Sequence, residues 1–146
     1  MTLRIRIFAA LALAFAFAVP AVAQESEKYQ NLLTPLLDTK TDIVEQPLAY
    51  PSGAPKVTAA IVTIPPGETT GWHTHEVPLF VYILEGEVSV DYGDKGTKVY
   101  KAGDSFMEAM NWPHNATNTT SEPVRIMAVY MGAEGATNTA SAEGRK

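Results

Sequence analysis

Three histidines are the residues of this chain best suited to chemistry. The sequence of 146 residues contains only His73, His75 and His114, and a single residue separates the first two. Residues two apart in an extended strand point to the same face, so His73 and His75 present two imidazoles side by side. Neutral imidazoles bind first-row divalent metals well. The alternative is a pair of surface histidines, because this spacing alone is not specific.

Cysteine is absent from the sequence. The fold therefore has no disulfide framework and no thiolate nucleophile or ligand. Any metal must be held by nitrogen and oxygen atoms, and stability must come from the packed core.

The N-terminus has the pattern of a secretory signal peptide. Arg4 and Arg6 precede an apolar run from Ile7 to Val19, and Ala21-Val22-Ala23 fits a cleavage site. The run is shorter than the roughly 20 residues that a spanning helix needs. The alternative is an uncleaved membrane anchor. We expect residues 1–23 to be removed, giving a periplasmic or secreted protein without stable membrane anchoring.

Charge argues against nucleic acid as a partner. Removing Arg4 and Arg6 from the 11 lysines and arginines leaves nine basic residues against 16 acidic ones. Lysine and arginine form no cluster that could follow a phosphate backbone. We expect a small-molecule ligand rather than a polyanion.

The rest of the chain favours an all-β fold. Residues 24–55 predict an extended arm with a short helical turn, and residues 133–146 a flexible polar tail. Between them, short apolar segments alternate with glycine turns, which favours a barrel or sandwich. The predicted strands cover residues 56–63, 79–92 as a pair split near Gly86, 98–101, 105–110 and 124–131.

The segment around His73 and His75 resembles the first sequence motif of the cupin family. That motif has a glycine, five residues, H-x-H, a few residues, usually a glutamate, and a second glycine. Gly67, His73, His75 and Gly86 stand at the matching positions. The position of the usual glutamate is occupied by Leu79.

The second cupin motif is matched by Gly103, His114 and Asn118, whereas its usual proline and inner glycine are replaced by Ala109 and Asn111. The resemblance implies a single cupin domain over residues 56–132, an antiparallel jelly-roll barrel. It further implies that His114 joins His73 and His75 around one divalent metal ion. Iron is the ion we expect first, and manganese, nickel, copper and zinc also suit such ligands.

Glu108 is the carboxylate that could replace the missing glutamate. It precedes His114 by six residues, at a position where cupins usually carry an apolar residue that points inward. A glutamate inside a barrel is costly unless it is paired or metal-bound. We expect Glu108 to be a metal ligand or a catalytic acid/base, and the alternative is a bulge that turns it to solvent. Glu76 should face away from the two histidines and be a poor ligand.

The resemblance leaves the function open, since fold and ligand set do not define chemistry. We expect an exported, mononuclear metal-dependent enzyme, dioxygenase-like, acting on a small organic molecule. The alternatives are a non-catalytic binding protein for a metabolite or metal, and a barrel without metal. A homodimer that uses the arm before Pro51 is also consistent with the family.

Overall fold

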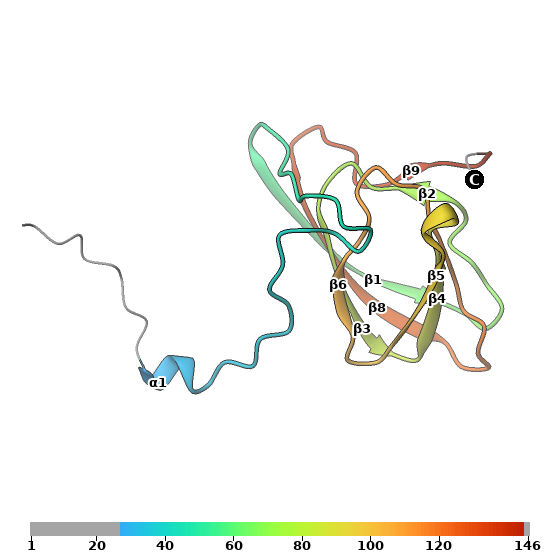
Figure 1. Cartoon of the computed structure of the whole chain (residues 1–146), viewed down its shortest axis with the longest axis horizontal. Coiled ribbons are helices and arrows are strands. Elements are labelled where there is room, and N and C mark those ends of the chain that lie inside the picture. The colour runs from blue at the N-terminus through green and yellow to red at the C-terminus, as the bar shows by residue number, and fades with distance from the viewer. Residues whose placement is uncertain (1–26, 145–146) are drawn as a thin grey trace, which may run out of the picture. The chain divides into compact units, whose positions relative to one another are not determined.

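The computed structural model describes residues 27–144, and nearly all of their regular structure is β-sheet (Figure 1). The predicted signal peptide, residues 1–23, lies outside the described residues. The chain divides into two units, residues 1–34 and residues 35–146. The first contains one helical turn, α1 (Glu27–Gln30). The second contains β1 (Pro55–Ile64), β2 (His73–Thr74), β3 (Leu79–Glu85), β4 (Glu87–Asp91), a 3-10 turn (Gly93–Lys95), β5 (Thr97–Lys101), β6 (Ser105–Met107), β7 (Asn115–Thr117), β8 (Val124–Ala133) and β9 (Ala140–Ser141).

The strands of the second unit form three antiparallel sheets. The larger sheet has the order β1-β8-β3-β6, and the smaller one has the order β5-β4-β7. A short ribbon of β2 and β9 lies at one end of these sheets (Figure 1). This double-sheet barrel confirms the predicted all-β jelly-roll class.

The core fills the space between the two main sheets. Alternate residues of β3, of β4 and of the first half of β8 are buried, as expected for strands with one face on a core. The buried positions are Leu79, Val81 and Ile83 in β3, Val88 and Val90 in β4, and Val124, Ile126 and Ala128 in β8. These inward side chains also form the walls of the site described below.

Two residues in the sequence motifs described above adopt a positive φ and form turns there. Gly86 links β3 to β4 at φ 79°, where a Cβ would lie 2.9 Å from the Pro123 carbonyl oxygen. Asn111, which stands where the family has a glycine, adopts φ 52°. Asparagine tolerates this left-handed region better than most residues, which explains how the turn before His114 forms without glycine.

The two segments that flank the predicted domain are more structured than we expected. In the arm, Asp42 accepts hydrogen bonds from the backbone amides of Val44, Gln46 and Met110, so this loop is fastened to the barrel. The segment predicted as a flexible tail contains a short strand, β9, which pairs with β2. Backbone pairing compensates there for a lack of large apolar side chains.

No helix within residues 27–144 is long and apolar enough to cross a membrane.

β1 exposes Val57 and Ile61 on the edge of the larger sheet. The homodimer stays a prediction.

We predict that Gly86→Ala lowers the free energy of unfolding by about 2 to 4 kcal/mol, because it adds a steric clash to an unfavourable φ. Gly93→Ala is the matched control, since Gly93 has φ 63° and no heavy atom within 4 Å of an added Cβ. It should lose only about 1 to 2 kcal/mol from backbone strain. Chemical denaturation compares the two variants, and equal losses would contradict the close approach of Pro123.

Candidate metal centre

The three histidines meet at the end of the barrel where β2 pairs with the residue that precedes β7. His73 and His114 exchange two backbone hydrogen bonds, each with an N···O distance of 3.0 Å. His75 forms a bridge with Met110, whose neighbour Asn111 donates its amide to the His75 carbonyl. Backbone pairing therefore brings all three imidazoles together, as the resemblance implied.

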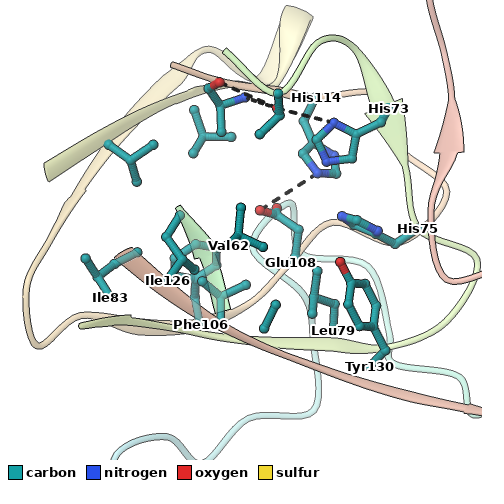
Figure 2. A pocket seen from close by; sticks show the side chains of 16 residues that line it. Val62, His73, His75, Leu79, Ile83, Phe106, Glu108, His114, Ile126 and Tyr130 are labelled. Carbon is teal, nitrogen blue, oxygen red and sulfur yellow. Dashed lines mark hydrogen bonds and ion pairs between the residues drawn. The ribbon is translucent and has the colours of Figure 1, made fainter. Parts of the chain in front are cut away.

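The three rings face one another across a small space (Figure 2). The ring centroids of His73 and His75 are 4.9 Å apart, those of His73 and His114 4.4 Å, and those of His75 and His114 5.0 Å. One nitrogen from each ring lies within 4.8 Å of the others. Metal–imidazole bonds are about 2.0 to 2.1 Å long, so small side-chain rotations would close the rings on one ion.

Backbone carbonyls orient each ring. Nδ1 of His73 bonds the carbonyl oxygen of Gly71 at 2.8 Å, and Nδ1 of His114 bonds that of Trp112 at 2.8 Å. Nδ1 of His75 bonds the carbonyl of Asn138 at 2.9 Å. A carbonyl oxygen only accepts, so each Nδ1 carries the proton. The lone pair of each neutral ring is then on Nε2, as metal binding requires.

Burial keeps the three imidazoles neutral. It lowers the pKa of His75 to about 3, and it also lowers the pKa values of His73 and His114. Desolvation disfavours the charged ring. At neutral pH, all three rings are therefore free of the second proton that would block a ligand bond.

The environment of His114 fits a metal. Its side chain is 1% exposed, and its Nε2 has no hydrogen-bond partner among the described residues. Buried polar atoms without a partner are rare and costly. A divalent ion shared with His73 and His75 would satisfy this atom, so the donor set suits the ion that the family implies.

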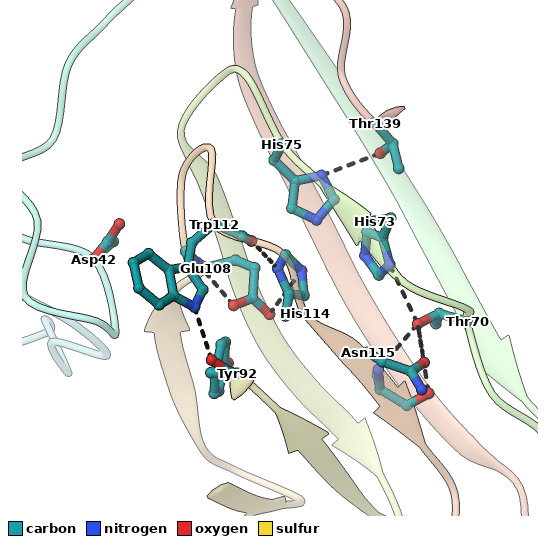
Figure 3. Close-up of polar contacts among 12 residues, drawn as sticks. Asp42, Thr70, His73, His75, Tyr92, Glu108, Trp112, His114, Asn115 and Thr139 are labelled. Atoms are coloured by element: carbon teal, nitrogen blue, oxygen red, sulfur yellow. Dashed lines mark hydrogen bonds and ion pairs between the residues drawn. The ribbon is translucent and has the colours of Figure 1, made fainter. Parts of the chain in front are cut away.

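Glu108 points into the barrel beside this group. Its side chain is buried, and its Oε2 lies 3.8 Å from Nε2 of His114 (Figures 2 and 3). Its Oε1 accepts a hydrogen bond from the Ala109 amide at 2.8 Å. Burial raises the pKa of Glu108 to about 7, although this hydrogen bond opposes the shift. The alternative in which Glu108 turns to solvent is therefore wrong, whereas its role as ligand or acid/base stays a prediction.

Glu108 also lies directly across from Leu79. The Glu108 amide donates to the Leu79 carbonyl at 2.8 Å, which extends the pairing of β3 with β6. Leu79 holds the motif position of the usual glutamate, so a carboxylate on the neighbouring strand stands beside that position. Glu76, by contrast, is exposed.

A cavity of about 70 Å³ continues from the histidines into the barrel. The polar side chains in its lining are few: the three histidines, Glu108, Thr70 and Tyr130. The rest of the lining is apolar: Val62, Leu79, Val81, Ile83, Val88, Val90, Phe106, Ala116, Ile126 and Ala128. This arrangement, a largely apolar pocket with a few converging polar groups, is typical of small-molecule sites.

Several residues of the site carry no signal in the sequence. Tyr130 places its ring 5.6 Å from that of His75. Thr139 places its hydroxyl oxygen 3.1 Å from Nδ1 of His75 (Figure 3). The indole nitrogen of Trp112 donates a hydrogen bond to the Tyr92 carbonyl at 2.8 Å. This bond fixes Trp112, whose own carbonyl holds Nδ1 of His114. Tyr130 could have been placed near the site only from the alternation of inward and outward side chains along β8.

Comparisons with known proteins agree with this geometry. The cupin domain family matches residues 60–130. No protein of curated function matches the sequence. The match spans both sequence motifs and all three histidines.

Solved structures share the fold. A protein with a double-stranded β-helix domain from Klebsiella pneumoniae is 21% identical, with a TM-score of 0.52, covering 73% of this chain and 99% of that one. An oxalate decarboxylase from Lactobacillus farciminis is 24% identical, with a TM-score of 0.51, over 58% of this chain and 26% of its own. A DMSP lyase from Ruegeria pomeroyi is 20% identical, with a TM-score of 0.53, over 62% of this chain and 45% of its own. This chain thus aligns with about a quarter of the decarboxylase and under half of the lyase.

We predict that Glu108→Gln stabilises the metal-free protein, and that the gain grows with pH. The folded state holds the Glu108 proton up to a pKa of about 7, against 4.5 for a glutamate in water. Its contribution to stability is therefore full below pH 4.5 and is lost as pH rises through 7. Glutamine avoids this loss, which is on the order of 3 kcal/mol at most.

Chemical denaturation at pH 5 and pH 8 with a chelator present measures the difference. The exposed Glu76→Gln is the control, because it removes a carboxyl charge without changing the interior of the barrel. A stability difference for Glu108→Gln that is the same at both pH values would show that this carboxyl titrates normally.

Proposed function

Because residues 60–130 of this chain are a cupin domain, we propose that the protein is an exported, mononuclear metal-dependent enzyme acting on a small organic molecule. His73, His75 and His114 hold one divalent ion, and Glu108 exchanges protons with the substrate beside it. The observation that carries this proposal is the convergence of three neutral imidazoles on one point, with the Nε2 of His114 buried and unpaired.

The ion, with iron expected first, would supply Lewis acidity or redox chemistry at the open end of the cavity. The chain's own residues supply the rest. The carbonyls of Gly71, Trp112 and Asn138 fix the rings, so the ligand nitrogens need little reorganisation. The apolar walls exclude water, which strengthens electrostatic interactions within the site.

Glu108 is suited to proton transfer. In the metal-free protein, burial raises the pKa of Glu108 to about 7. A divalent ion beside it would lower that pKa and favour the carboxylate, which is the form that accepts a proton. Its Oε2 is 3.8 Å from Nε2 of His114, so it is within reach of a molecule bound at the ion.

The cavity defines the class of substrate. Its lining contains no lysine or arginine, and apart from Glu108 and the histidines it is nearly apolar. A volume of about 70 Å³ admits only a few non-hydrogen atoms. We infer a small substrate with a short apolar group. Any anionic group on it would have to be bound by the ion, because the lining offers no cationic side chain.

A second candidate function is metal or metabolite binding without turnover. The separation of 3.8 Å between Glu108 and His114 also suits two ligands of the same ion. If Glu108 completes the coordination, fewer positions remain for a substrate, and the protein would store or carry the ion. Glu108→Gln separates the two functions, because a ligand role predicts lost metal and an acid/base role predicts lost activity with metal retained.

We predict that alanine at His73, His75 or His114 reduces the bound metal from about one ion per chain to a small fraction. Removing one of three ligands leaves a site too weak to survive dialysis. Glu76→Ala, which changes an exposed carboxylate next to His75, should keep its metal. Elemental analysis of the four dialysed variants decides this. If Glu76→Ala loses as much metal as His73→Ala, the assignment of ligands fails.

Export is supported by Arg4, Arg6, the apolar run and Ala21-Val22-Ala23. We predict that the protein from its natural host accumulates outside the cytoplasm and starts at or near Gln24. Its intact mass should lack residues 1–23, and a mass that includes them would contradict cleavage.

A further inference from the structure

The C-terminal segment Asn138–Glu143 lies across the metal centre instead of extending into solvent. Within it, β9 pairs with β2 in the register His73↔Ser141 and Thr74↔Ala140. Ala142 is buried, and its amide donates to the Trp72 carbonyl at 2.9 Å. The segment is thus fastened to β2, which carries His73 and leads directly into His75 (Figure 1).

The segment supplies the partner that orients His75. His73 and His114 bond the carbonyls of residues two positions earlier, so their own turns fix them. His75 has no such local partner, and its Nδ1 instead bonds Asn138, 63 residues further along the chain. The hydroxyl of Thr139 lies 3.1 Å from the same nitrogen (Figure 3). The orientation of one ligand therefore depends on the C-terminal segment.

The same segment forms one wall of a larger outer pocket. This pocket has a volume of about 360 Å³ and shares His73, His75 and Tyr130 with the inner cavity. Thr139, Ser141 and Glu143 line it from the C-terminal side. Glu143 contributes the only acidic side chain of this lining, which contains no lysine or arginine. Apart from the ion, this pocket therefore offers no cationic group to a ligand.

We propose that Asn138–Glu143 is a positioning element of the metal site. The Asn138 carbonyl keeps the proton of His75 on Nδ1 and leaves Nε2 for the ion, while Thr139, Ser141 and Glu143 wall the pocket that leads to it. The part of this inference that concerns the ion rests on the proposed function. The part that concerns the His75 tautomer does not.

The first experiment compares a chain ending at Thr137 with one ending at Gly144, which retains the whole segment. β9 pairs only with β2, so the two main sheets keep their pairing in the shorter chain. Loss of a partner that orients a ligand typically costs 10- to 100-fold in metal affinity. We expect that loss for the chain ending at Thr137, measured with zinc by competition with a chromophoric chelator, and none for the chain ending at Gly144.

The second measurement needs no metal. Long-range 1H–15N spectra of metal-free protein report which nitrogen of each histidine carries the proton. His75 should be the Nδ1–H tautomer in the full chain and shift toward Nε2–H in the chain ending at Thr137, whereas His73 and His114 should not change. Asn138→Ala is the control, because it removes the side chain and keeps the carbonyl, so His75 should stay Nδ1–H.

Ala142→Pro provides a variant of full length if the shortened chain does not fold. It removes the amide that holds the segment to Trp72, and it should shift His75 in the same direction by a smaller amount. An unchanged His75 tautomer in these variants would overturn the inference, as would equal zinc affinity of the two shortened chains. Failure of the full chain to bind zinc would contradict the proposed function, and the tautomer would still decide the inference.

Discussion

Three imidazoles share one small, largely apolar space in this protein, and the rest of the barrel is arranged around that constraint. Each ring loses hydration when it is buried, and burial lowers all three pKa values. Each ring is compensated on one side by a backbone carbonyl, which leaves the facing nitrogens with lone pairs. For His114 that nitrogen has no partner within the described chain. A divalent ion resolves this unfavourable arrangement, so the protein is better explained with a metal than without one.

The sheets serve this site in two ways. Reciprocal hydrogen bonds between His73 and His114 set the separation of two of the imidazoles, and the bridge of His75 to Met110 sets the position of the third. The apolar interior that stabilises the fold also provides the walls of the cavity, and it is what raises the pKa of Glu108. Stability and chemistry therefore depend on the same inward faces of the strands.

Much of this could be predicted from the sequence, because its signals are local. Alternation and glycine turns placed β1, β3, β4, β5 and β8, and the H-x-H spacing put two imidazoles on one face. The place of His114 came only from the resemblance, since no local pattern joins residues 73 and 114. Strand β9 was not predicted, because the small polar residues around it resemble a disordered tail. A backbone carbonyl such as that of Asn138 has no sequence signature, so its contact with His75 could be seen only in the structure.

The most direct test of the central claim is X-ray absorption spectroscopy of the zinc-loaded protein. The account predicts three imidazole nitrogens at about 2.0 to 2.1 Å from the ion, with the multiple scattering of intact rings. The remaining light-atom scattering would come from water or from the Glu108 carboxylate. A spectrum with fewer than three imidazoles, or with oxygen ligands alone, would contradict the assignment of His73, His75 and His114 to one ion.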